Sequence, residues 1–108
     1  MMEEQPYTLA RWRVREGQEE AFVAAWHQLA AFFLMLKDAP RWGTLLRNVD
    51  DTREFYSFGP WPSMETIAAM RAHPETPLAI GRLTALCEET DLGTYVVAAT
   101  AGTAPAAD

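Results

Sequence analysis

The spacing of apolar residues changes once along the first third of the chain, from a strand-like to a helix-like pattern. Residues 7–14 alternate between two sets of side chains, as a β-strand with two different faces does. Gly17 lies in the turn that follows. From residue 18 to residue 37 the apolar positions recur every three or four residues, which predicts an amphipathic helix. Those positions are Phe22, Ala25, Trp26, Leu29, Phe32, Phe33 and Leu36.

The middle of the chain predicts a hairpin and a short helix. Residues 42–49 and 54–58 have strand composition, and a short turn at residues 50–52 separates them. Ser63 then stands where the N-cap of a helix is expected. Pro74 ends that helix because it cannot continue the backbone hydrogen bonds.

The last third predicts one more helix and one more strand. Apolar positions at helical spacing indicate a helix over residues 76–88, which places Cys87 on its buried face as a small apolar residue. Residues 91–93 are predicted as a turn, and residues 94–98 as the last strand.

The predicted order is β-α-β-β-α-β, with the second helical region broken in two. This order is typical of an α+β, ferredoxin-like fold, an antiparallel sheet with helices on one face. We expect a single domain over residues 1–97 and a disordered tail over residues 98–108. The sheet face without helices is expected to pair with a second copy in a homodimer. Its expected occupants are Tyr7, Leu9, Leu46, Tyr56 and Phe58.

Composition narrows the classes of partner. The 108 residues carry a net charge of −6, which disfavours binding to nucleic acid or to anionic lipid. A single cysteine excludes an intramolecular disulfide and a cysteine metal cluster. The N-terminal residues are acidic and do not resemble a signal peptide. The longest apolar run, residues 29–36, is too short to span a bilayer. A cytoplasmic protein is therefore the expectation.

Several segments are similar to the antibiotic biosynthesis monooxygenase family of dimeric α/β-barrel proteins. They are WRVREGQEEAF, FGPWPSMETIAAM followed by RAHP, and GTYVV. In that family a G-x-W-x-S segment leads from the third strand into the second helix, and here it spans residues 59–63. The resemblance covers residues 7–97. It implies a cavity between the sheet and its own helices.

The family's activities differ, and the resemblance favours some of them over others. Its members include cofactor-independent oxygenases of aromatic polyketide anthrones and quinols, haem-degrading enzymes and autoinducer-handling proteins. Haem degraders use an Asn on the first strand, and a Trp and a His in the second helical region. The matching places here hold Ala10, Met70 and Ile80, so haem degradation is not favoured, and we expect no cofactor.

Aromatic side chains from different elements are the candidate walls of a pocket for a planar ligand. Trp12 and Trp26 would face each other between the sheet and the helix, with Tyr56 and Trp61 beside them. Aromatic walls suit flat ligands because offset rings attract by about 0.5–1.5 kcal/mol per pair. The alternative is that these residues fill the core, and that Trp61 between two prolines is structural.

Three side chains are candidates for catalysis. His73 is predicted as a general base at the pocket mouth; alternatively it hydrogen-bonds the last carbonyls of its helix. Arg47 or Arg11 is predicted to stabilise an enolate or peroxide anion; alternatively both form salt bridges or face a second subunit. His27 is predicted to lie on the surface or at an interface. The spacing of the histidines does not favour a metal site.

Two functions of different classes follow. The first is a small homodimeric monooxygenase, an oxidoreductase that oxygenates a planar aromatic or quinonoid molecule without a cofactor. The second is a non-catalytic module that binds a small molecule or a partner on the same dimeric fold. Isomerisation or cyclisation of a polyketide without oxygen would use the same pocket.

Overall fold

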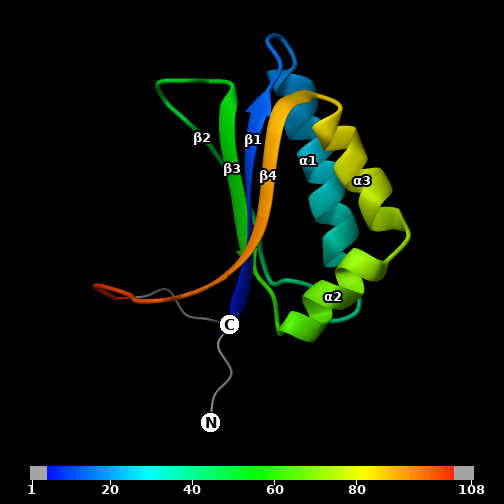
Figure 1. Cartoon of the computed structure of the whole chain (residues 1–108), viewed down its shortest axis with the longest axis vertical. Coiled ribbons are helices and arrows are strands. Elements are labelled where there is room, and N and C mark those ends of the chain that lie inside the picture. The colour runs from blue at the N-terminus through cyan, green and yellow to red at the C-terminus, as the bar shows by residue number, and fades with distance from the viewer. Residues whose placement is uncertain (1–4, 104–108) are drawn as a thin grey trace.

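The computed structural model describes residues 5–103. Four strands and three helices follow in the order β-α-β-β-α-α-β (Figure 1). They are β1 (Pro6–Val14), α1 (Glu19–Leu34), β2 (Thr44–Arg47), β3 (Glu54–Pro60), α2 (Met64–Ala72), α3 (Glu75–Thr84) and β4 (Cys87–Val96). The predicted break in the second helical region is confirmed, with His73 and Pro74 between α2 and α3.

The strands form one antiparallel sheet in the order β2-β3-β1-β4. All three helices lie on the same side of it, with α1 and α3 along the strands and α2 across one end (Figure 1). The predicted α+β, ferredoxin-like arrangement is confirmed. β1 is central because it pairs with β3 on one edge and with β4 along its whole length on the other.

The alternation along β1 sorts its side chains between two faces. Ala10, Trp12 and Val14 are buried against the helices, whereas Arg11 and Arg13 lie on the opposite face and are only partly covered. A period of two residues places successive side chains on opposite faces of a sheet, so a shift of one residue would expose Trp12. Burial of this one set therefore fixes the register of the central strand.

Aromatic rings fill the core between the sheet and α1. Phe22 of α1 is fully buried and packs on Trp12, with ring centroids 5.5 Å apart, and on Phe55 of β3 at 5.0 Å. A smaller cluster at the α2 end joins Trp61, Ile67 and Met70. The two clusters hold the helices on the sheet at opposite ends.

α2 begins at the predicted N-cap. The Ser63 hydroxyl accepts a hydrogen bond from the backbone N–H of Thr66 at 3.2 Å, and the Thr66 hydroxyl accepts one from the Ser63 N–H at 3.2 Å. The reciprocal pair forms a capping box in which threonine replaces the usual glutamate. This cap sets the direction in which the chain leaves β3.

The C-terminal boundaries predicted from the sequence are wrong. α3 ends at Thr84, and β4 begins at Cys87, so residues 91–93 form part of the strand rather than a turn. Pairing with β1 outweighs the helical spacing of the apolar residues, since β4 gains a partner along all of β1. Cys87 is buried as predicted, but on a strand, and burial raises the pKa of its thiol.

α1 and β2 are both shorter than predicted. α1 ends at Leu34 rather than near residue 37, and β2 spans four residues instead of the eight from 42 to 49. No helix within residues 5–103 has the length and apolar character to cross a bilayer. Residues 97–103 form no helix or strand, and the rest of the predicted tail, residues 104–108, lies outside the described residues.

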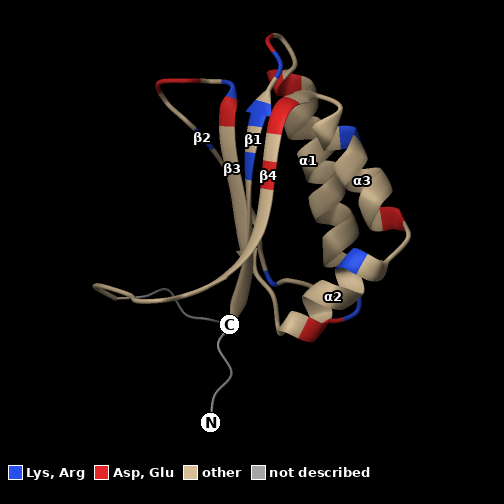
Figure 2. Cartoon of the chain, in the orientation of Figure 1, with Lys and Arg blue, Asp and Glu red and all other residues tan. Residues whose placement is uncertain are grey.

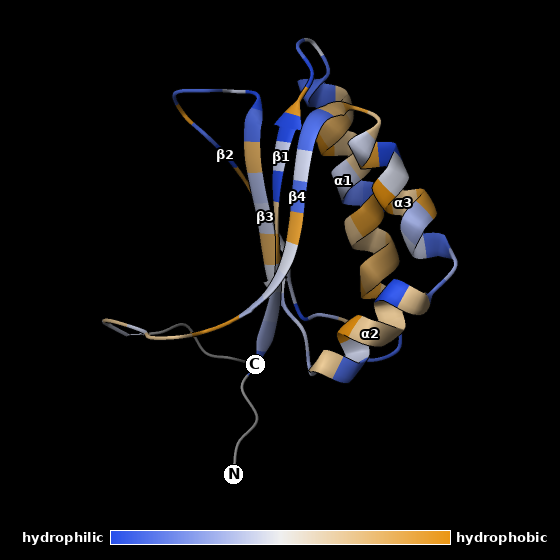
Figure 3. Cartoon of the chain, in the orientation of Figure 1, coloured by the Kyte–Doolittle hydropathy of each residue, from blue (hydrophilic) through white to orange (hydrophobic). Residues whose placement is uncertain are grey.

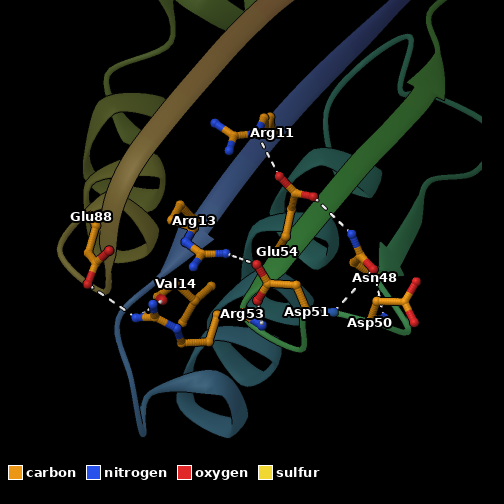
Figure 4. A network of polar contacts seen from close by, with 9 residues as sticks. All are labelled: Arg11, Arg13, Val14, Asn48, Asp50, Asp51, Arg53, Glu54 and Glu88. Atoms are coloured by element: carbon orange, nitrogen blue, oxygen red, sulfur yellow. Dashed lines mark hydrogen bonds and ion pairs between the residues drawn. The ribbon is translucent and has the colours of Figure 1, made fainter.

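Charged residues gather at one end of the outer sheet face. Figure 2 shows them on the upper parts of β1, β3 and β4, and Figure 3 shows hydrophobic bands alternating with less hydrophobic ones lower on β3 and β4. Glu54 is the centre of the network in Figure 4: it accepts hydrogen bonds from Arg11 Nε at 2.9 Å and from Asn48 Nδ2 at 3.1 Å. Arg13 pairs with Asp51 beside it.

The network ties three strands and the β2–β3 turn together. Arg53 extends it to β4 through Glu88 at 3.2 Å. Hydrogen bonds from Asn48 and then Arg11 hold the pKa of Glu54 below its usual range, and the Arg13 guanidinium does the same for Asp51. Both carboxylates stay ionised over the neutral range, where the pairs contribute their stability.

We expect Glu54→Gln to lower the free energy of unfolding at pH 7 and to lower it less at pH 3. A carboxylate whose pKa is depressed on folding contributes stability above its unfolded pKa of about 4.3 and loses it as pH falls through the folded value. Urea unfolding at the two pH values measures the difference. Glu16→Gln, in an exposed turn, is the control and should change neither; an equal Glu54→Gln effect at both pH values would contradict the account.

Candidate ligand-binding site

A cavity of about 440 Å³ lies between the sheet and the helices. Its floor comes from β1 and β3, one wall from α1, and its ends from α2, β4 and the loop before β2. This volume falls in the range of small-molecule pockets, about 300–1,000 Å³. The cavity is on the face where the resemblance implied one.

All four tryptophans contribute to its lining. Trp12 and Trp61 are almost fully buried, whereas Trp26 and Trp42 are partly exposed. Trp42 is held edge-on by Phe58 at 5.8 Å and by Tyr7 at 6.2 Å. The indoles of Trp12, Trp26 and Trp61 make the cavity suited to a flat, apolar molecule.

Two hydroxyl groups on the floor carry its buried polarity. Trp12 Nε1 donates to Ser57 Oγ at 2.9 Å, and Trp61 Nε1 donates to Thr8 Oγ1 at 3.0 Å. Both Ser57 and Thr8 line the cavity. A hydroxyl that accepts a hydrogen bond keeps its own O–H to donate, so each can bind an oxygen of a ligand.

His27 and Arg71 supply the ionisable groups of the lining. His27 follows Trp26 on α1, and its ring lies edge-on to that indole at 5.9 Å. Arg71 lies in the last turn of α2, and its guanidinium donates to Thr94 Oγ1 on β4. An imidazole exchanges protons at neutral pH and a guanidinium binds anions, so the cavity has a base and a cation at its rim.

The predicted pocket residues divide into two groups. Trp12, Trp26 and Trp61 line the cavity, as expected for aromatic walls. Tyr56 lies on the outer face of β3, opposite Arg11 in register, and is not part of the lining. The structure thus brings the three tryptophans together and leaves Tyr56 on the other side of the sheet.

The predicted catalytic residues lie outside this cavity. Arg11 is bound to Glu54 on the outer face, and Arg47 is exposed on the edge strand β2. His73 caps α2, and its Nδ1 accepts a hydrogen bond from the Glu75 backbone N–H at 3.1 Å. Its ring also packs edge-on against Phe32, with centroids 5.1 Å apart.

These contacts correct the expected placement of the catalytic groups. The His73 ring is not part of the cavity lining, and its Nδ1 accepts a hydrogen bond from the first turn of α3. Only the backbone N–H of His73 bonds a last carbonyl of α2, that of Met70 at 3.2 Å. The helix break at Pro74 turns α3 back over the sheet and directs the imidazole toward Glu75. The prediction that His73 acts as a base would require a different bound position for the substrate.

The side chains that sequence reasoning missed had weak signals. Thr8 and Ser57 are small polar residues on the buried face of strands. Their register partners, Gly59 and Ala10, each lie two residues from the indole donor, Trp61 and Trp12 respectively. His27 is exposed, as predicted for the margin of the α1 apolar stripe, and the structure adds that this margin also borders the cavity.

The three positions that match the functional residues of haem degraders line the cavity. Ala10, Met70 and Ile80 are all part of its wall. None is the Asn, Trp or His of that activity, so the structure places apolar surface where those groups would stand. Within residues 5–103, no group of three or more His, Cys, Asp or Glu side chains is arranged to hold a metal ion.

Known proteins match this chain in structure but not in sequence. No protein-family model and no curated protein matches it. SnoaB, a cofactor-independent oxygenase from Streptomyces nogalater, superposes with a TM-score of 0.81 at 21% identity, over 91% of this chain and 97% of its own. The chain has the same fold.

Two further solved structures share this fold. Proteins from Nitrosomonas europaea and Bordetella bronchiseptica, both provisionally described as antibiotic biosynthesis monooxygenases, have TM-scores of 0.76 and 0.75, each at 14% identity. They cover 94% and 86% of this chain, and 98% and 96% of their own. The predicted resemblance is therefore confirmed at the level of the fold.

Gly59 allows the loop before β2 to close one end of the cavity. A Cβ at this position would lie 2.5 Å from the carbonyl oxygen of Trp42 and 3.3 Å from the Cα of Gly43. We expect Gly59→Ala to lower the free energy of unfolding by about 1–3 kcal/mol, because backbone must move. Chemical unfolding measures this.

Gly81→Ala is the matched control for this substitution. No atom lies within 4 Å of the added Cβ, and the residue is on α3. It should raise the free energy of unfolding by about 0.5–1 kcal/mol, as alanine favours a helix. A Gly59→Ala protein as stable as the wild type would show that the loop does not rest on the sheet as described.

Proposed function

We propose that this protein is a small monooxygenase that binds a planar aromatic or quinonoid molecule between its sheet and helices and oxygenates it without a metal or cofactor. The cavity supports this most directly, because its indole walls fit a flat ring system and its floor offers hydroxyl donors. The shared fold with a protein that is a cofactor-independent oxygenase is consistent with the proposal.

Oxygenation of such a substrate requires few groups from the protein. A substrate of the anthrone or hydroquinone class, once deprotonated, passes one electron to O₂. In the anthrone case the radical pair combines to a hydroperoxide, which loses water to leave a carbonyl. The protein has to remove the first proton, stabilise the oxyanion and exclude water.

The cavity offers a residue for each task. His27 is the imidazole in the lining, so we propose it, in place of His73, as the group that takes the proton. Ser57 and Thr8 would donate to the enolate oxygen, with their own oxygens already bound by indole N–H groups. The tryptophans orient the ring and keep the site dry.

We also propose a homodimer through the outer sheet face. The register places Leu9 opposite Phe58, Leu46 opposite Tyr56, and Tyr7 opposite Tyr95. About half of Leu46 and of Tyr95 is exposed. Arg11 and Tyr56 would then belong to the subunit interface, whereas the cavity lies on the other side of the sheet.

A binding module without catalysis is the second candidate. The apolar character of the cavity supports it, because most of the lining side chains are hydrophobic and uncharged. Such a protein would bind the same flat molecules and leave them unchanged.

Oxygen uptake separates the two functions. With anthrones and hydroquinones at neutral pH, the proposal predicts consumption above the autoxidation rate, and a rate about 10²-fold lower in His27→Gln, as expected for loss of a general base. His73→Gln is run beside it because both histidines were candidates. If only His73→Gln is inactive, the base is His73. Binding of the compounds without oxygen uptake would favour the binding module.

A further inference from the structure

We propose that the ligand of this cavity carries one anionic oxygen group, which Arg71 binds at the rim while the flat body lies against the indoles. The inference rests on the proposed binding of a planar molecule and names its chemical class: an aromatic compound with a carboxylate or phenolate at one end.

The charge of the lining supports this class. Arg71 is the single Arg or Lys in the described lining, and no Asp or Glu lies there. The protein as a whole has a net charge of −6. A cavity in so acidic a protein would ordinarily repel an anion, so a lone guanidinium on its rim gives this site the opposite local sign.

Among the described residues Arg71 forms no ion pair, whereas three arginines of the outer sheet face do. Arg11, Arg13 and Arg53 each pair with a carboxylate on the sheet. Within residues 5–103, no carboxylate lies within ion-pair distance of the Arg71 guanidinium. Its charge is available for a ligand.

The position and orientation of the Arg71 guanidinium also suit an anionic ligand. The guanidinium of Arg71 reaches from α2 to Thr94 on β4, where it donates to Oγ1. Thr94 pairs with Thr8, whose hydroxyl is on the cavity floor. One nitrogen held by a neutral acceptor orients the planar fork and leaves further N–H groups to bind a carboxylate. The oxyanion would therefore lie near the α2 end of the cavity.

Calorimetric titration with 2-naphthoate and its neutral analogue 2-naphthamide tests the inference. The two rings are alike and only one probe is charged. We expect 2-naphthoate to bind about tenfold more tightly to the wild type, because a hydrogen bond from a guanidinium favours a charged acceptor and solvent screens that gain at an exposed site. Arg71→Gln should abolish this preference. Arg82→Gln, at the end of α3 and outside the lining, should keep it.

The outcomes separate this inference from the proposed function. Equal affinity of the wild type for both probes, or a preference that survives Arg71→Gln, would overturn the anionic class while leaving the aromatic cavity intact. If neither probe binds, the proposed binding function is wrong and the inference falls with it. 2-Naphthol, titrated at pH 7 and again above its own ionisation, distinguishes the sources: binding that tightens on ionisation only with Arg71 present extends the class to phenolates, and no tightening restricts it to carboxylates.

Discussion

The packing of Trp12 on the central strand is the constraint on which both the core and the cavity depend. The Trp12 ring packs against Phe22 in the core. The ring also lines the cavity, and its N–H is satisfied by Ser57 on the neighbouring strand. A buried indole N–H without a partner costs about 1–3 kcal/mol, so the position of β3 beside β1 is coupled to the residue that forms the cavity floor.

The indole–hydroxyl pairs explain how a small domain keeps a hollow in its interior. Cavities in a packed core are costly, and a chain of this size has little stability to spare. Trp12 and Trp61 are rigid, large and hydrogen-bonded, and therefore hold the floor without side chains filling the space above it. The capping box at Ser63 directs α2 away from β3, which places Met70 and Arg71 at the end of the cavity.

The two faces of the sheet use charge in different ways. On the outer face, Arg11, Arg13 and Arg53 are matched to carboxylates and join neighbouring strands. On the helix side the unmatched Arg71 faces a largely apolar hollow. A shift of one residue in the register of β1 would turn Arg11 and Arg13 toward the helices, so the period-two pattern of β1 keeps these charges on the outer face.

The element order and the apolar side of β1 could be predicted from the sequence because both depend on local periodicity. The end of α3 could not, since Cys87 fits a helical stripe as well as a strand and pairing with β1 decides between them. Three of the four tryptophans that line the cavity, Trp12, Trp26 and Trp61, were predictable because large aromatic side chains tend to lie between the sheet and the helices. His73 was misplaced since its ring nitrogen's partner, Glu75, depends on how α3 turns. His27 and Arg71 sit at helix margins, where spacing alone does not show whether a neighbour is solvent or cavity.

A pair of alanines on α1 tests most directly whether this cavity is the binding site. Ala30 lines it, whereas Ala31, the next residue, is exposed outside it. The measurement is the affinity for 2-naphthoate of Ala30→Phe and Ala31→Phe, after unfolding experiments confirm that both are folded. The account predicts that the ring at position 30 occupies the cavity and abolishes binding, while the Ala31 variant binds as the wild type does. Unchanged binding by a folded Ala30→Phe protein would contradict it.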